Sequence, residues 1–404
     1  MKNTMLFFAL LFFTYSFSQL KLEEVKIKTT QKGIKKSLKG ASNTTLVTSK
    51  ELLKAACCNL AESFETNPSI DVNFSDALTG TKQIKMLGLT SPYIMITEEN
   101  IPSVRGASQA YGMSFTPGTW VESIQITKGA GSVVNGYESI SGQINTELLK
   151  PMDDIPFFLN AYGDTSSRFE LNTHFNKRIN DKWATSLLVH GSGRFGETDT
   201  NNDGFLDNPK GKQLNVSNRW QYANQETGWV SFINARFMKD EKLSGEIKFD
   251  PDRDKLTTNH WGSEIETERF DFSSKVGYVF KDMPYQSIGF QNAFSLHNQQ
   301  SYYGLNQYNI KQQSFYSNLI FNSIIDNTRN KFSTGINLAL DNYSEFVNTF
   351  DVGRIDNSIG AFFEYTFDDS DKFSYILGAR IDNHNRLGTF ITPRLHIRYN
   401  PWKE

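Results

Sequence analysis

Five positions between residues 199 and 207 have the spacing of a calcium-binding loop, four of them with side-chain oxygens and Phe205 with its backbone carbonyl. They are Asp199, Asn201, Asp203, Phe205 and Asp207, and Gly204 follows the third ligand position. Alternate oxygen ligands can point at one ion, and the glycine permits the sharp turn that such loops need. In an EF-hand, a glutamate occupies position twelve, where this chain has Lys210. We predict bound Ca²⁺ in this loop, with an ordinary polar loop as the alternative, and we expect no required cofactor.

Cysteine and histidine offer little further chemistry. Cys57 and Cys58 are adjacent, so they could be soft ligands for a metal such as copper, but two cysteines do not close a site. Buried packing or a free thiol pair is the favoured interpretation. The six histidines are scattered, and no nucleophile elbow, P-loop or zinc-enzyme motif occurs. We therefore do not expect an enzyme.

The overall composition excludes two classes of protein. The 404 residues carry 42 Lys plus Arg against 44 Asp plus Glu, without the basic excess of a generic nucleic-acid binder. Hydrophobic residues make up 38%, and the only long apolar run is N-terminal, which excludes a bundle of transmembrane helices. Aromatic residues nevertheless reach 13%. Both a membrane β-barrel and a soluble β-sandwich could have this composition.

The N-terminus has the order of a secretory signal peptide. Lys2 precedes the apolar run Met5 to Phe13, and Ser16 and Ser18 supply the small residues of a cleavage site. We predict a signal peptide over residues 1–18. Residues 19–43, rich in Lys, Thr, Ser and Gly, are predicted to be a flexible tail.

Residues 44–151 are predicted to form a small α+β domain. Thr48 and Glu51 have the spacing of a capping box, and a second short helix over 60–64 should end before Pro68. Short strands are expected over 83–87, 93–97 and 123–127, with frequent glycines between the later elements.

Residues 152–404 alternate apolar and polar side chains with period two, which predicts antiparallel strands with one apolar and one polar face. The clearest alternating segments are 270–280, 332–340, 359–367, 373–381 and 391–399. Short polar turns near 179–182, 225–228, 327–330 and 368–371 are predicted to alternate with longer polar loops over 196–213, 239–268, 299–311 and 345–356. A membrane barrel has such short and long connections at its two ends, whereas a sandwich has no reason to alternate them. His174, His190 and His396 should face a wet lumen.

At this point the chain resembles the TonB-dependent outer-membrane receptors, in a form similar to those of Bacteroidetes bacteria. Residues 121–145, from Val-Glu-Ser-Ile-Gln-Ile-Thr-Lys-Gly to Ile-Ser-Gly-Gln-Ile-Asn, resemble the plug signature I-E-x-I-E-V-x-x-G-…-Y-G-…-G-G-x-I-N. Residues 83–88, 93–102 and 60–70 resemble three further plug motifs. The chain departs from the pattern at Lys128 and Ala130, where the family often has Arg and Pro, and at Glu98-Glu99-Asn100, which replaces I-D-G.

The resemblance implies a plug domain over 44–151 and a transmembrane β-barrel over 152–404, and hence a mainly β fold. Residues Leu22, Glu23, Glu24, Val25, Lys26 and Ile27 resemble a TonB box, which adds a strand to the TonB partner. The implied function is active import across the Gram-negative outer membrane of a scarce nutrient, by default a ferric siderophore or another metal complex. The implied partners are TonB with its inner-membrane complex, outer-membrane lipid and the cargo, and no nucleic acid. A passive porin or adhesin barrel is the alternative, and a soluble secreted sandwich comes third.

The strand number leads to one further expectation. Roughly twelve strands fit after Pro151, against the 22 with which the resembling family closes its barrel. We therefore expect a C-terminally truncated receptor with an open barrel, in which the first strand, near 157–162, does not pair with the last, near 391–399.

Overall fold

The computed structural model describes residues 34–36, 41–52, 59–64, 70–76, 79–369 and 372–402. The predicted signal peptide, the TonB-box residues 22–27 and the Cys57-Cys58 pair lie outside the described residues.

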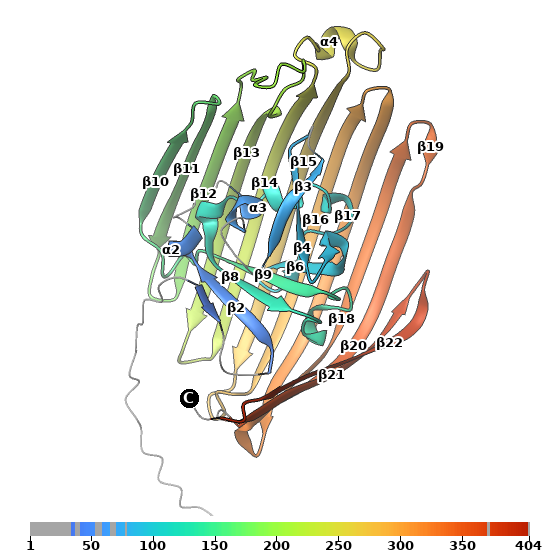
Figure 1. Ribbon diagram of the computed structural model, residues 1–404. Coiled ribbons are helices and arrows are strands. Elements are labelled where there is room, and N and C mark those ends of the chain that lie inside the picture. Colours follow the sequence, from blue (N-terminus) through green and yellow to red (C-terminus); the bar gives the residue numbers. More distant parts are fainter. Residues whose placement is uncertain are drawn as a thin grey trace, which may run out of the picture. The chain divides into compact units, whose positions relative to one another are not determined.

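The N-terminal part of the described chain is an α+β domain built on two sheets (Figure 1). The larger sheet contains, in spatial order, β1 (Ile34–Lys36), β2 (Asn43–Thr48), β8 (Val121–Lys128), β9 (Gly142–Leu148), β6 (Ile94–Glu98) and β7 (Ile101–Pro102). The smaller sheet contains β3 (Asp71–Asp76), β4 (Thr81–Met86) and β5 (Leu89–Thr90). Two short helices, α2 (Ser49–Leu52) and α3 (Leu60–Ser63), precede β3, and short 3-10 helices η2 (Ser91–Tyr93), η3 (Gly106–Ser108), η4 (Gly112–Ser114), η5 (Gly118–Trp120) and η6 (Val133–Asn135) link the later strands.

Local sequence accounts for these elements. The Asn59 side chain accepts a hydrogen bond from the N–H of Glu62 and so caps α3, as polar residues at helix starts do. The apolar positions of the strands meet in one core, where Ile84, Ile124, Ile126 and Ile144 are completely buried. The predicted short helices and the three predicted strands of this domain are confirmed.

The second part is one antiparallel sheet of 13 strands (Figure 1). Its strands are β10 (Phe157–Gly163), β11 (Arg168–Arg178), β12 (Trp183–Arg194), β13 (Lys210–Asn224), β14 (Trp229–Gly245), β15 (Gly262–Val279), β16 (Ser287–Tyr303), β17 (Asn306–Ile325), β18 (Asn327–Val347), β19 (Phe350–Asp351), β20 (Arg354–Asp368), β21 (Phe373–His384) and β22 (Gly388–Tyr399). Neighbours in sequence are neighbours in space, except that in the described chain the short β19 pairs only with β18, which also pairs with β20. Within the described residues β10 does not pair with β22. The expectation of a mainly β fold with an open, partial barrel is confirmed.

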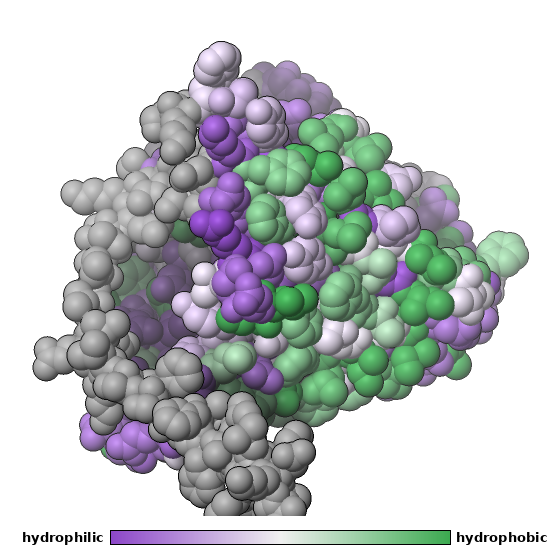
Figure 2. Space-filling view, turned by 90° about the horizontal axis from the view of Figure 1, so that it is seen from below, coloured by the Kyte–Doolittle hydropathy of each residue, from purple (hydrophilic) through white to green (hydrophobic). Residues whose placement is uncertain are grey.

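The sheet has an apolar outer face and a polar inner face. Large apolar side chains point outward and are exposed, such as Leu377 (52% exposed) and Leu395 (60%), while polar side chains such as Asn215, Thr267 and Asn318 are fully buried. Figure 2 shows a broad hydrophobic area on the visible surface. This polarity is the reverse of a soluble sandwich and is typical of strands that face lipid outside and a polar lumen inside. No helix in the described part of the chain is long and apolar enough to cross a membrane.

The predicted connections are partly wrong. Strands β16 and β17 continue through most of the predicted loop 299–311, and only Gly304 and Leu305 separate them. Long connections are present at 195–209 and at 246–261, where helix α4 (Pro251–Asp254) lies, but both predicted loops also included strand ends. Strand ends with polar residues on both faces look like loops in the sequence, so polarity alone does not mark where these strands stop.

Candidate functional site

The plug domain, residues 41–148, lies against the polar inner face of the sheet, and its closest contact is the turn between β6 and β7. Glu99 and Asn100 in this turn have positive φ angles of 51° and 65°. Two consecutive non-glycine residues in this region need support from their surroundings. The Glu99 N–H donates to the Thr146 carbonyl (2.8 Å), and the Asn100 N–H donates to Asn145 Oδ1 (2.7 Å).

Glu99 is the buried carboxylate of this turn, and two cations from the sheet neutralise it. Arg219 of β13 donates a hydrogen bond to Glu99 Oε1, and Lys275 Nζ of β15 lies 3.1 Å from Oε2. Lys275 also donates to the Glu99 carbonyl at 3.2 Å. Burial alone would raise the pKa of the Glu99 carboxyl, but Arg219 and then Lys275 outweigh it and hold the pKa at about 2. The plug is therefore tied to the sheet by a charge that stays ionised at ordinary pH.

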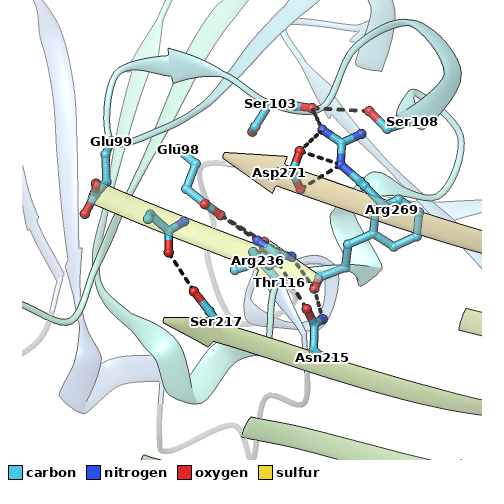
Figure 3. Close-up of polar contacts among 12 residues, drawn as sticks. Glu98, Glu99, Ser103, Ser108, Thr116, Asn215, Ser217, Arg236, Arg269 and Asp271 are labelled. Atoms are coloured by element: carbon cyan, nitrogen blue, oxygen red, sulfur yellow. Dashed lines mark hydrogen bonds and ion pairs between the residues drawn. The ribbon is translucent and has the colours of Figure 1, made fainter. Parts of the chain in front are cut away.

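A second buried cation extends this contact (Figure 3). Arg236 of β14 donates to Glu98 Oε2 at 3.2 Å, to Thr116 Oγ1 at 3.3 Å and to the Phe115 carbonyl at 2.6 Å. Asn215 accepts from Arg236 Nε (3.1 Å) and donates to the same carbonyl. Arg236 thus binds two separate parts of the plug, Glu98 and residues 115–116.

The far strands of the sheet hold another plug segment, residues 131–136 around η6. Arg394 of β22 donates to the carbonyls of Gly131 (2.6 Å), Ser132 (3.0 Å) and Gly136 (3.2 Å). Arg380 of β21 donates to the Val133 carbonyl at 2.7 Å, and Glu364 of β20 accepts from the Val133 N–H at 3.0 Å. The two arginines bind backbone carbonyls of the segment, and Glu364 also accepts from the Ser132 hydroxyl at 2.9 Å.

Between these two contacts, η3 and its flanking residues meet β17 and β18. Arg105 lies 2.7 Å from Asp341 Oδ2 of β18 and 3.6 Å from Glu138 of the plug. The side chain of Gln312 in β17 accepts from the Ala107 N–H at 2.9 Å. The contact between plug and sheet is therefore polar along its length and includes several buried ion pairs.

Two of the cavities between the plug and the sheet differ in the chemistry of their lining. One, of about 170 Å³, is lined by plug segments 59–62, 79–82 and 110–114 and by β11 to β14, and many of its side chains are charged. The other, of about 430 Å³, is lined mainly by amide and hydroxyl side chains of β8, β9 and the wall from β16 to β22. We call them the charged cavity and the amide-lined cavity.

The predicted calcium ligands lie in the connection between β12 and β13. The Asp199 carboxylate accepts from the N–H groups of Asp203 (3.1 Å) and Gly204 (2.9 Å), and Asp207 Oδ2 accepts from the Thr200 N–H (2.9 Å). The carboxylates close the loop through its own backbone. No group of three or more His, Cys, Asp or Glu side chains placed to hold a metal ion occurs among the described residues. Calcium binding by Asp199, Asn201, Asp203, Phe205 and Asp207 stays a prediction.

His174, His190 and His396 lie on the inner face of the sheet, as the alternation in the sequence predicted. His174 and His190 are buried on the inner face, His174 stacked on Phe158 with ring centres 4.6 Å apart, and His396 lines the amide-lined cavity.

The buried charges of the plug contact were not predicted. The only sequence signal was the unusual Glu98-Glu99-Asn100 at the turn, together with Arg219 and Arg236 at inward positions of alternating strands.

An α+β domain docked by buried ion pairs on the polar face of a sheet whose outer face is apolar has the arrangement of a plug against the inner wall of a β-barrel. Residues 36–143 match the TonB-dependent Receptor Plug Domain family. No curated relative matches the sequence. Three solved structures with this fold are the siderophore receptor PirA from Acinetobacter baumannii (TM-score 0.70, 13% identity, 89% of this chain and 59% of that one), FpvA from P. aeruginosa bound to a heterologous pyoverdine (0.72, 11%, 90% and 54%) and the copper transporter OprC (0.67, 12%, 91% and 58%).

Residues 36–143 therefore form a TonB-dependent receptor plug domain, and the chain as a whole shares the fold of these solved structures. It spans less than two thirds of the length of these solved structures.

Proposed function

We propose that this protein belongs to a receptor of the outer membrane that imports a scarce nutrient with energy supplied through TonB. The proposal rests on the observation that the plug lies on the polar face of a sheet whose other face is apolar, as in a strand wall that contacts lipid. A plug in this position fills space that a passive pore would leave open, so it favours gated import over a passive porin or an adhesin barrel.

The proposed mechanism has three parts. Cargo binds on the side of the long connections 195–209 and 246–261. TonB pairs with residues 22–27 as an added strand, since backbone pairing needs only an extended, accessible segment. Force on this segment then reaches the plug through the tail, and the plug contacts on the sheet must yield for cargo to pass.

We propose a ferric siderophore or another metal complex as cargo. The support is the likeness in fold to solved receptors described as siderophore receptors and to one described as a copper transporter. Growth of the source strain under iron, copper and cobalamin limitation, with and without the gene, would assign the cargo class, because only the limiting nutrient that the receptor imports should restrict the deletion strain.

The test of TonB coupling is a deletion of residues 22–28 at the native locus. We expect energised uptake to be lost while folding and cargo binding are kept, because residues 22–28 precede the predicted plug domain in the sequence. The matched control replaces residues 29–33 with the same number of Gly and Ser residues and should import normally. Normal import by the 22–28 deletion strain would show that the segment is not a TonB box.

A further inference from the structure

The connection between the plug and the sheet, residues 149–156, is bound by side chains of two different strands. We call this connection the strap. Met152, near its middle, is held from both sides: its N–H donates to Gln221 Oε1 of β13 at 3.1 Å, and its carbonyl accepts from Arg178 of β11 at 3.0 Å. Strand β12 lies between β11 and β13, so the strap crosses the inner face of three strands.

The contact with β11 is regular. His174, Asn176 and Arg178 occupy every second position of this strand, so their side chains leave it on the same face. Asn176 donates to Asp154 Oδ2 at 2.7 Å and to the Ile155 carbonyl at 2.5 Å. His174 Nε2 lies 3.1 Å from the same oxygen of Asp154, and both side chains are largely buried. Three consecutive inward side chains of β11 therefore bind the strap.

The other end of the strap is fixed to the plug. The Leu149 N–H donates to the carbonyl of Trp120 at 2.9 Å, and Trp120 is buried in the plug core. Lys150 Nζ lies 3.1 Å from Glu122 of β8. The Lys150 carbonyl accepts from the Asp154 N–H at 3.1 Å, which closes the strap into a turn. Little free chain is left between the contacts with the plug and those with the sheet.

The strap and the predicted TonB-binding segment stand at opposite ends of the plug sequence. Residues 22–27 precede β1, which lies at one edge of the larger plug sheet. The strap follows β9, which pairs with β8 on one side and with β6 on the other. A strand at the edge has fewer hydrogen bonds to lose than a strand with two neighbours. Force applied through residues 22–27 should therefore reach β9 and the strap last.

We propose that the strap is the anchor of the plug, and that the side chains of β11 and β13 that bind it are positioning residues. They hold the C-terminal end of the plug on the sheet while TonB pulls at the N-terminal end. Resting on the proposed import function, the inference states which end of the plug stays in place during transport. The plug then returns to its docked position because this end has not left β11 and β13.

The first test is hydrogen exchange of the full chain in detergent, followed at the strap and at β8 in the plug core. Asn176→Asp places two carboxylates where an amide now donates to Asp154 at 2.7 Å, so the strap should open. We expect backbone hydrogen exchange in residues 149–156 to become about tenfold faster, with exchange in β8 unchanged.

Two further variants control this test. Asn176→Asp combined with Asp154→Asn swaps the two groups, restores a hydrogen bond between an amide and a carboxylate, and should recover most of the protection of the strap. Asn383→Asp, at an exposed amide of β21 that donates to Thr389, is the matched control and should leave hydrogen exchange in the strap unchanged.

The second test is the entry of a large polar antibiotic, such as vancomycin, into cells that carry the variants at the native locus. Without its anchor, the plug should leave the sheet when TonB pulls, so Asn176→Asp should make the cells sensitive and the double variant should not. Asn176→Asp in a chain that lacks residues 22–28 should give resistant cells. A merely structural loss of fit between plug and sheet would admit the antibiotic with or without residues 22–28.

The anchor is overturned by unchanged hydrogen exchange of the strap in Asn176→Asp, by an equal increase at the strap and at β8, by cells that stay resistant, or by sensitivity that persists without residues 22–28. If Asn176→Asp does not fold, Arg178→Gln removes only the bond to the Met152 carbonyl and should speed exchange in the strap about threefold, and no change would refute the anchor. The exchange measurement needs neither TonB nor a membrane. Failure of the import proposal would appear as normal import by the 22–28 deletion of the otherwise unaltered chain and would leave the exchange result unchanged.

Discussion

The guanidinium of Arg219 donates a hydrogen bond to the carboxylate of Glu99, 120 positions earlier in the chain. The two side chains join a strained turn of the plug to the inner wall of the sheet, and both are buried. The Nε and Nη1 atoms of Arg219 are buried without hydrogen-bond partners, so Glu99 is the principal compensation for its charge. This makes the pair the most sensitive point of the contact between plug and sheet.

Glu99→Gln should therefore loosen the plug. The substitution keeps the size of the side chain but leaves Arg219 as a buried cation without its counter-charge, which costs about 3 kcal/mol. Urea unfolding of the full chain in detergent should shift to lower concentration, and protease sites in the plug should become accessible. Glu226→Gln, at an exposed turn ion pair of 3.9 Å, is the control and should change stability by less than about 0.5 kcal/mol. Equal shifts in both variants would contradict the assigned role.

The ion pair between Glu99 and Arg219 predicts that the folded protein loses stability at acid pH. The pKa of Glu99 falls from an ordinary value of 4.5 to about 2 in the folded protein, because Arg219 and Lys275 outweigh the effect of burial. A lowered pKa stabilises the fold above the unfolded value, so the contribution is complete above pH 4.5 and disappears as the pH falls towards 2. The loss amounts to ~3 kcal/mol. Urea midpoints measured from pH 7 to pH 2 should fall more steeply below pH 4.5 in the parent than in Glu99→Gln. Parallel profiles would argue against this titration.

Arg394→Gln should release the plug segment 131–136. Three backbone carbonyls would lose their charged donor, at a cost of about 1–3 kcal/mol. Limited proteolysis should cut this segment faster in the variant than in the parent. Arg398→Gln is a close control, since Arg398 lies on the same strand and face but bonds to Asn400. Faster cutting in the control as well would indicate that β22 is generally loosened, and not that the hydrogen bonds of Arg394 to the plug segment hold it in place.

The sequence predicted elements better than contacts. Alternation assigns each residue of β21 or β22 to a face, which is why the outward Leu377 and Leu395 and the inward His396 were placed correctly. Alternation cannot tell a lumen residue that faces water from one that holds the plug, so Arg380 and Arg394 gave no signal of their role. The partners of Glu98 and Glu99 lie more than 100 positions away, and no local pattern encodes such a pairing. The tight turn at Gly304-Leu305 was missed because polar strand ends resemble loops.

The calcium prediction can be tested through loop stability. In the structure, the Asp203 carboxylate accepts from the Phe205 N–H at 2.8 Å and from Asn201 Nδ2 at 2.9 Å, so Asp203→Ala removes two internal hydrogen bonds with or without an ion. If calcium binds, added Ca²⁺ should raise the melting temperature of the parent, and a chelator should reverse the rise, whereas the variant should not respond. Asp252→Ala in the neighbouring connection is the control and should respond like the parent. The same melting temperature of the parent with and without calcium would remove the site.

The outward face of β21 allows a direct test of the membrane assignment. Leu377 is half exposed in the middle of the strand, and its neighbours on that face are apolar. In a soluble protein, Leu377→Arg would place a charge in water and change stability by about 0.5 kcal/mol or less. In a lipid-facing strand the same charge costs about 2–4 kcal/mol near the middle of the bilayer. We therefore expect Leu377→Arg to reduce association of the full chain with lipid vesicles. Leu387→Arg, at an equally accessible position in the turn between β21 and β22, should have little effect, because a charge there stays in water. Equal vesicle association of the parent and both variants would mean that the apolar face does not contact lipid.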